Sequence, residues 1–354
     1  MKRLLALLMV AAMAMAMLAG CSADTQPASG GTQPASSGTQ PAEATKQSSE
    51  VIRIKFGVSS VAESCQGKSA QVFADLANER LAGQVEVSLY PNEQLGSNET
   101  MMENMLSDLQ QCMMSSLDLY SIYSSDLNIM TMAFAFKNVD HLNAFLSSEY
   151  GKAIWDDLYE KGFKILSYNF NRKPRLFCSK TPIARLSDMK GLKWRVPNID
   201  IYQKNFRALG AVPTYVAWNE VSYALMQGVV DACETTYECV YTAGIHNYAP
   251  YLTLIDYGFA KDSLAINTAT WEKLTPEQQE VLQKCADEAA DFYNDTIDKQ
   301  WEEESKKIEA EGGKFVDFDR DSFTSILDDY AKQLEDEGFW KTPGLFEKVQ
   351  ELSY

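Results

Sequence analysis

Residues 187–235 hold the side chains whose types and spacing best suit binding chemistry. A β-prone run, Leu192–Val196, carries a single arginine, Arg195, and is closed by Pro197. An arginine on a strand is costly to bury unless an anion meets it. Its planar guanidinium can hold a carboxylate through two parallel hydrogen bonds. We therefore expect an anion-binding pocket at Arg195.

Aromatic and basic residues accompany this arginine in the sequence. Tyr215 and Trp218 follow a Gly-Ala-Val-Pro turn, and Thr235 follows a second apolar run. Arg175 lies twenty residues before Arg195, in a basic segment of an otherwise acidic chain. Such a segment is usually a solvated turn.

The net charge limits the class of partner. The chain has 49 acidic and 32 basic residues, which gives a formal net charge of −17. This argues against nucleic acid as a partner, because binding a phosphate backbone calls for basic patches. An anion site in such a chain must be a local pocket with its own cations.

The chain lacks the residue patterns of common catalytic and metal sites. Its two histidines, His141 and His246, are far apart, and it has no Gly-x-Ser-x-Gly or His-Glu-x-x-His motif. Six cysteines follow Cys21, none in a Cys-x-x-Cys pair. We predict a protein that is not an enzyme and uses no cofactor. Disulfides and free buried thiols both fit the six cysteines, with Cys233 and Cys239 the nearest pair in sequence.

The N-terminal residues predict export. Two basic residues, a short apolar run and Leu-Ala-Gly-Cys indicate a signal peptide over 1–20. The last four residues resemble a bacterial lipoprotein box, which implies lipidation of Cys21. Residues 21–50 repeat Thr-Gln-Pro-Ala among Ser and Gly, a composition typical of a flexible tether. We expect an extracytoplasmic protein anchored to a membrane through Cys21.

Strand and helix signals alternate from residue 51 onward. Strands are predicted at 51–58 and 85–90, and helices at 69–81 and 98–109, which favours a βαβ arrangement with a parallel sheet. The apolar run 130–137 is predicted to be a further strand.

A long helix is predicted near the end of the chain. Thr275 and Pro276 are typical of a helix start, and no proline or glycine follows until Gly312. About 36 residues at 1.5 Å each span roughly 54 Å, enough to lie across two lobes.

Several motifs in fixed order resemble one protein family. Residues 186–197, 208–213, 220–225 and 228–234 resemble the DctP-type substrate-binding proteins of TRAP (tripartite ATP-independent periplasmic) transporters. The similarity runs from residue 52 to about 315. It implies an α/β, two-lobed periplasmic-binding-protein-like fold, with hinge strands and a long helix crossing both lobes. The implied lobes are 51–172 plus about 261–300, and 173–260 plus about 301–354.

The resemblance also implies a function and a set of site residues. The ligand would be a small organic acid whose carboxylate meets Arg195, with Arg175 assisting. The protein, a monomer, would deliver this acid to a small and a large membrane permease subunit. The further ligand contacts implied or suggested are Ser59, Asn98, Ser116, Tyr215, Trp218, Thr235 and Tyr237. The tyrosines fit core packing equally well.

Departures from the family pattern leave the identity of the acid open. Ala232 stands where the family has glycine, and Ala133 where it has proline. Two other functions remain open at this point: a binding protein that feeds a sensor, and an exported enzyme acting on carboxylates.

Overall fold

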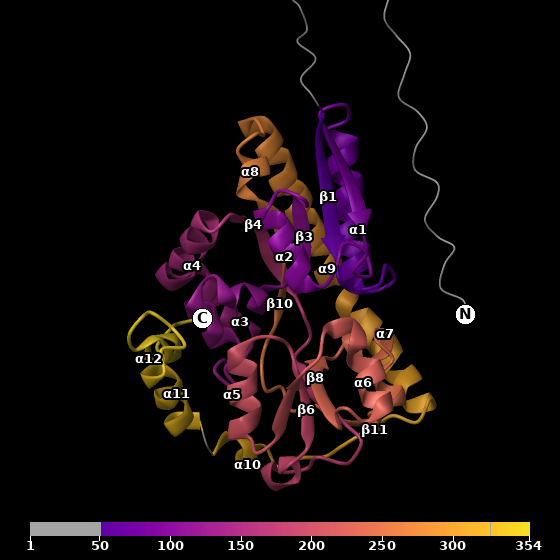
Figure 1. Ribbon diagram of the computed structural model, residues 1–354, viewed down its shortest axis with the longest axis vertical. Helices are drawn as coiled ribbons and strands as arrows, with labels where there is room; N and C mark the ends of the chain where they lie inside the picture. The colour runs from indigo at the N-terminus through magenta and orange to yellow at the C-terminus, as the bar shows by residue number, and fades with distance from the viewer. Residues whose placement is uncertain (1–50, 326) are drawn as a thin grey trace, which may run out of the picture. The chain divides into compact units, whose positions relative to one another are not determined.

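Two mixed β-sheets organise the part of the chain that the structure, a computed structural model, describes: residues 51–325 and 327–354 (Figure 1). The predicted signal peptide, the tether and Cys21 lie outside these residues. Within the described ranges, no helix is both long enough and apolar enough to cross a membrane.

The first sheet has the strand order β2-β1-β3-β10-β4. Strand β1 pairs in parallel with β2 and β3, and β10 runs antiparallel between β3 and β4. The predicted βαβ arrangement is confirmed. The strands are β1 (Ile52–Val58), β2 (Val85–Tyr90), β3 (Cys112–Ser116), β4 (Phe163–Asn171) and β10 (Lys261–Asn267), with α1 (Cys65–Arg80) and α2 (Asn98–Leu106) as connecting helices.

The second sheet has the order β11-β9-β5-β8-β6-β7. Here β6 is parallel to β7 and β8, whereas β5 is antiparallel to β8 and β9. The strands are β5 (Arg175–Ser179), β6 (Lys193–Val196), β7 (Val212–Tyr215), β8 (Ala232–Thr236), β9 (Tyr251–Thr253) and β11 (Lys314–Phe315), and the helices between them include α5 (Asp200–Ala208), α6 (Val221–Gln227) and α7 (Cys239–Thr242).

The long helix α9 (Pro276–Ala310, orange in Figure 1) packs on both sheets. It begins at a capping box in which Thr275 and Gln278 satisfy each other's backbone N–H groups. Buried side chains between Leu282 and Ile297 join the core of the first sheet, and Ile308 joins the core of the second. The predicted two-lobed α/β fold with a helix crossing both lobes is confirmed.

The C-terminal segment packs against parts of both predicted lobes. The Tyr330 hydroxyl donates to Asn205 in α5, whereas Thr342 donates to Asp126 in an early 3₁₀ helix. The C-terminal helices are α10 (Arg320–Thr324), α11 (Leu327–Asp336) and α12 (Leu345–Gln350). The helices between β3 and β4 are η1 (Leu117–Ile122), η2 (Ser125–Met130), α3 (Val139–Ser147) and α4 (Glu149–Glu160).

The strand predicted at 130–137 is wrong. The Asn128 carbonyl accepts from the Thr131 N–H within a tight turn, and Phe134 has a positive φ of 60°. The Phe134 N–H then donates to the Tyr257 carbonyl. The run is apolar because it is buried. Its backbone polar groups are satisfied within turns and by Tyr257, so burial does not require a sheet partner.

Candidate functional site

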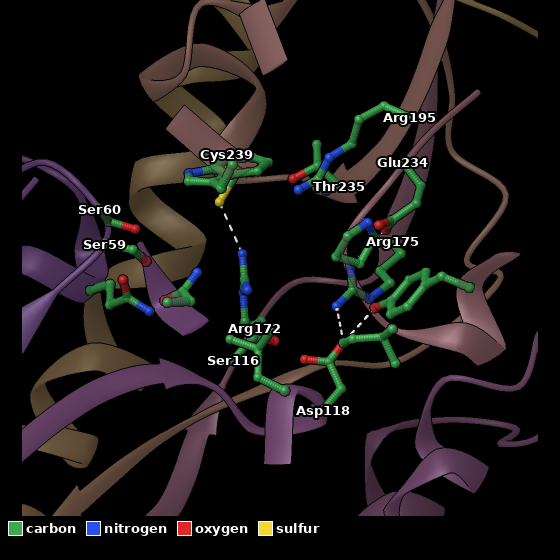
Figure 2. Close-up of a pocket in the computed structure, with 17 residues that line it drawn as sticks. Ser59, Ser60, Ser116, Asp118, Arg172, Arg175, Arg195, Glu234, Thr235 and Cys239 are labelled. Carbon is green, nitrogen blue, oxygen red and sulfur yellow. Dashed lines mark hydrogen bonds and ion pairs between the residues drawn. The ribbon is translucent and has the colours of Figure 1, made fainter. Parts of the chain in front are cut away.

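A cavity lies where the carboxyl ends of parallel strands from the two sheets meet (Figure 2). Ser59 follows β1 and Ser116 ends β3, while Arg195 and Thr235 lie near the ends of β6 and β8. In open α/β sheets this edge is where ligands bind. The cavity has a volume of about 80 Å³ and is partly open to solvent.

Seven of the nine predicted ligand residues line this one cavity. They are Ser59, Asn98, Ser116, Arg175, Arg195, Trp218 and Thr235. The other two, Tyr215 and Tyr237, lie outside its lining. Tyr215 is 48% exposed on β7, the edge strand of its sheet. Tyr237 packs on Trp301 of α9 and donates its hydroxyl to Asp256. Tyr215 therefore lies at the exposed edge of its sheet, and Tyr237 is packed against the long helix.

Arg195 is a buried cation without a carboxylate partner. Its side chain is 5% exposed, its Nε donates to the Val216 carbonyl at 3.0 Å, and the Trp218 ring lies 5.6 Å from its guanidinium carbon. No carboxylate among the described residues is within ion-pair distance, and the terminal nitrogens make no hydrogen bond to these residues. Burial lowers the pKa of Arg195. The terminal nitrogens are therefore available to a ligand.

Arg175 lines the same cavity but is held by two carboxylates. Its Nη1 donates to Glu234 at 2.6 Å and its Nη2 to Asp118 at 2.8 Å. Burial lowers the pKa of Arg175, but the acids outweigh it and raise the pKa well above the ordinary value. For Asp118, burial acts to raise the pKa, but the Arg175 charge outweighs it and holds the pKa of Asp118 below its usual range. The charge of Arg175 is thus compensated within the protein.

A third arginine, Arg172, was missed by the sequence reasoning. It follows β4 and donates to two residues of the second sheet's side: Thr236, the last residue of β8, at 2.6 Å, and Glu238, just after β8, at 2.9 Å. Its Nη1 also lies 3.4 Å from Asp262 in β10, and its Nη2 lies 2.9 Å from the sulfur of Cys239. Arg172 therefore ties the two sheets together beside the cavity. The basic segment 171–175 was its only signal in the sequence.

The wall opposite Arg195 carries polar oxygens without hydrogen-bond partners among the described residues. Each belongs to the first sheet or the segments that follow its strands. They are Asp118 Oδ1, Gln66 Oε1, Asn98 Oδ1 and Ser116 Oγ. A buried polar atom without a partner costs about 1–3 kcal/mol. The carboxylate and amide oxygens among them are therefore positioned for a ligand that supplies hydrogen-bond donors, whereas the Ser116 hydroxyl can donate as well as accept.

The described residues contain neither a cluster of metal ligands nor a disulfide. In residues 51–325 and 327–354, no three His, Cys, Asp or Glu side chains are placed to hold a metal ion. The six cysteines of the described chain are buried free thiols. Cys233, the neighbour of Cys239 in sequence, lies directly opposite Cys178 across the paired strands β8 and β5. The sulfur of Cys239 contacts Arg172 instead.

Residues 56–336 match the family described as "Bacterial extracellular solute-binding protein, family 7" (DctP). The chain belongs to this family. The resemblance identified in the motifs is thereby confirmed, and proteins of this family are extracytoplasmic.

Relatives in this family share the fold and differ in what they bind. A C4-dicarboxylate-binding periplasmic protein, DctP, of Rhodobacter capsulatus is 27% identical over 74% of this chain and 78% of its own. The 2,3-diketo-L-gulonate-binding periplasmic protein YiaO of Escherichia coli is 25% identical, over 79% and 86%. A crystal structure of a TRAP periplasmic solute-binding protein from Pseudomonas putida F1 with bound D-glucuronate aligns with a TM-score of 0.78 and 23% identity, covering 86% and 98%.

Proposed function

We propose that this chain is the extracytoplasmic substrate-binding subunit of a TRAP transporter, and that it captures a small organic acid between its lobes. The observation that carries the proposal is Arg195, a buried guanidinium that lines the cavity and has no carboxylate partner among the described residues. A carboxylate ligand supplies the missing charge and accepts two hydrogen bonds at once.

The ligands named for the relatives support a carboxylate. C4-dicarboxylates, 2,3-diketo-L-gulonate and D-glucuronate differ in length and in hydroxyl groups, but all are carboxylates. A contact for the carboxylate, combined with other contacts that differ from protein to protein, accounts for such a set. In the present chain we assign the carboxylate contact to Arg195.

The two lobes close on the ligand in this proposal. Lobe I comprises 51–172 and about 261–300, and lobe II comprises 173–260 and about 301–354, with Arg172 at their junction. A ligand that contacts Arg195 on one lobe and Ser59 on the other stabilises the closed state, because only that state makes both sets of contacts.

The remaining parts of the proposal concern location and partners. Lipidation of Cys21 anchors the protein, and residues 21–50 let the binding unit reach the small and large permease subunits. The protein acts as a monomer and performs no chemistry on the acid. Delivery to the permease follows from reopening of the lobes.

A thermal-shift screen followed by calorimetry tests the function. Protein that has been unfolded and refolded to remove bound ligand is screened against organic acids and neutral sugars. An acid at 100 times its Kd adds about 2.7 kcal/mol to the free energy of unfolding and raises the Tm by several degrees. If neutral sugars shift the Tm and no carboxylate does, the proposal fails.

Arg195→Lys tests the anchor itself. Lysine keeps the charge but cannot form the two parallel hydrogen bonds, so affinity for the acid should fall at least tenfold while the protein remains folded. Isothermal titration calorimetry measures the affinity, and circular dichroism checks the fold. Near-native binding by Arg195→Lys would contradict the anchor role.

A further inference from the structure

The charges around the cavity leave room for one anionic group and not two. Arg172 and Arg175 each face two carboxylates, at 2.6–3.4 Å, and only Arg195 of the three arginines lacks one in the described chain. Arg172 and Arg175 are thus already matched by carboxylates, and Arg195 alone of the three is open to an anionic group. A ligand with a second carboxylate would bring it close to Asp118 and Glu234, the two acids that line the cavity, where like charges repel in a poorly hydrated space.

Asp118 presents a free acceptor to the same space. Its Oδ2 accepts from Arg175 and from the Tyr202 hydroxyl, whereas its Oδ1 has no partner of good hydrogen-bond geometry in the described structure. The Ser116 hydroxyl is close enough to help hold the pKa of Asp118 down, and Oδ1 keeps a second lone pair for a ligand. The side chain is 6% exposed and lines the cavity. In Figure 2 this second oxygen points away from Arg175, toward the side of the cavity where Arg172 and Ser116 lie.

Gln66 is a second buried acceptor on this wall. It lies in α1, is 7% exposed, lines the cavity, and its Oε1 lacks a partner among the described residues. Asn98 Oδ1 and Ser116 Oγ are also unpaired. A site built to receive hydrogen bonds rejects an analogue without donors, because its buried acceptors then stay unpaired.

From this geometry we propose that Asp118, with Gln66, is the specificity-determining subsite of the cavity, and that it selects a monocarboxylate whose other end carries hydroxyl groups. The carboxylate binds Arg195, and the hydroxyls donate to Asp118 Oδ1 and Gln66 Oε1. Simple dicarboxylates and unsubstituted fatty acids are disfavoured, the former by charge and the latter by unpaired acceptors. The inference rests on the proposed function and names the class of acid.

Four six-carbon acids separate the two selection rules. D-gluconate has one carboxylate and several hydroxyls, and D-glucarate has two carboxylates with hydroxyls. Hexanoate and adipate are the corresponding acids without hydroxyls. Calorimetry on the refolded full chain should give D-gluconate at least tenfold tighter binding than either D-glucarate or hexanoate, with adipate weakest. The four-carbon set of D-erythronate, tartrate, butyrate and succinate repeats the comparison at a shorter length.

Asp118→Asn should invert part of this preference. The amide oxygen must take the place of Oδ2, because Arg175 and Tyr202 both donate there, so the amide NH₂ faces the cavity. An acceptor becomes a donor and one negative charge is removed. We expect D-gluconate affinity to fall at least tenfold and D-glucarate affinity to rise. Asp75→Asn, on the exposed face of α1, makes the same change of charge outside the cavity and should alter neither.

Gln66→Met keeps the test decisive if Asp118→Asn does not fold. It should weaken D-gluconate severalfold and leave hexanoate unchanged. Preference for succinate or adipate, equal binding of hydroxylated and plain acids, or failure of both hydroxylated monoacids to bind overturns the subsite. In the first two cases carboxylate binding itself still stands. If no carboxylate of any kind binds, both the subsite and the proposed function fail.

Discussion

Arg175 and Arg195 lie twenty residues apart, line the same cavity and are buried to a similar degree, with 9% and 5% of their surface exposed. They differ in their partners. Arg175 donates to two carboxylates, and Arg195 donates to one carbonyl and lies against one ring. Their pKa values accordingly shift in opposite directions, upward for Arg175 and downward for Arg195.

This difference separates a structural cation from a receptor for an anion. A buried guanidinium cannot lose its proton at ordinary pH, so it needs a counter-charge from the protein or from a ligand. Arg175 has its counter-charge in the folded chain. Arg195 obtains one only when an anion enters, which makes ligand binding and relief of the buried charge the same event.

The largest expected effect is on stability, from replacing the paired arginine. Arg175→Met leaves Asp118 and Glu234 buried without their cation, and the free energy of unfolding should fall by about 3–5 kcal/mol. Arg195→Met removes a buried charge that has no acidic partner within ion-pair distance, so it should match or exceed the wild-type stability while losing the acid. Urea unfolding at pH 7 compares the two variants. Equal losses in both would contradict the distinction between them.

The sequence could predict Arg195 but not the partners that distinguish the two arginines. Arg195, Thr235 and Trp218 belong to one continuous stretch whose strands and turns are locally encoded. Asp118 is 57 residues from Arg175 in sequence and reaches it only through the fold. No spacing rule connects them, and an aspartate in the first turn of a 3₁₀ helix has no pattern that marks it as buried.

The ligand role predicted for Tyr215 and the strand predicted at 130–137 both show what the sequence leaves out. Tyr215 was grouped with Trp218 by nearness in sequence, but it ends the edge strand β7, is 48% exposed and is outside the cavity lining. The run 130–137 is as apolar as a buried strand, and composition does not distinguish a buried strand from a buried series of turns. The helix from Pro276 was predictable to within a residue or two, because its capping box and its lack of breakers are both local signals.

Glu304 offers an acidic counterpart to Arg195. It lies in α9 at 7% exposure, accepts from Gln300 at 2.9 Å, and its other oxygen has no partner among the described residues. Unlike an arginine, it can take up a proton, and burial raises the pKa of Glu304 to about 7 from 4.5. Its stabilising contribution is therefore complete below about pH 4.5 and is lost as the pH rises through 7.

Glu304→Gln should remove this pH dependence. Relative to the variant, the wild type should lose stability between pH 4.5 and 7 and change little above that range. Chemical unfolding at several pH values measures the difference. Glu302→Gln, on the exposed side of the same helix, serves as the control and should retain the wild-type slope. A constant difference between wild type and Glu304→Gln across this range would show that Glu304 is already ionised in the folded protein.

The smallest expected effect concerns the ring beside Arg195. The Trp218 ring lies over the guanidinium, and a partly desolvated contact of this kind contributes about 0.5–2 kcal/mol. Trp218→Leu should therefore weaken binding of the tightest acid severalfold in calorimetry, with little change in stability. Tyr215→Leu is the matched control, since that ring lies outside the cavity and its loss should leave affinity unchanged. If Tyr215→Leu weakens binding as much as Trp218→Leu, the cavity extends to the edge strand, and Arg195 shares its ligand with a wider aromatic wall.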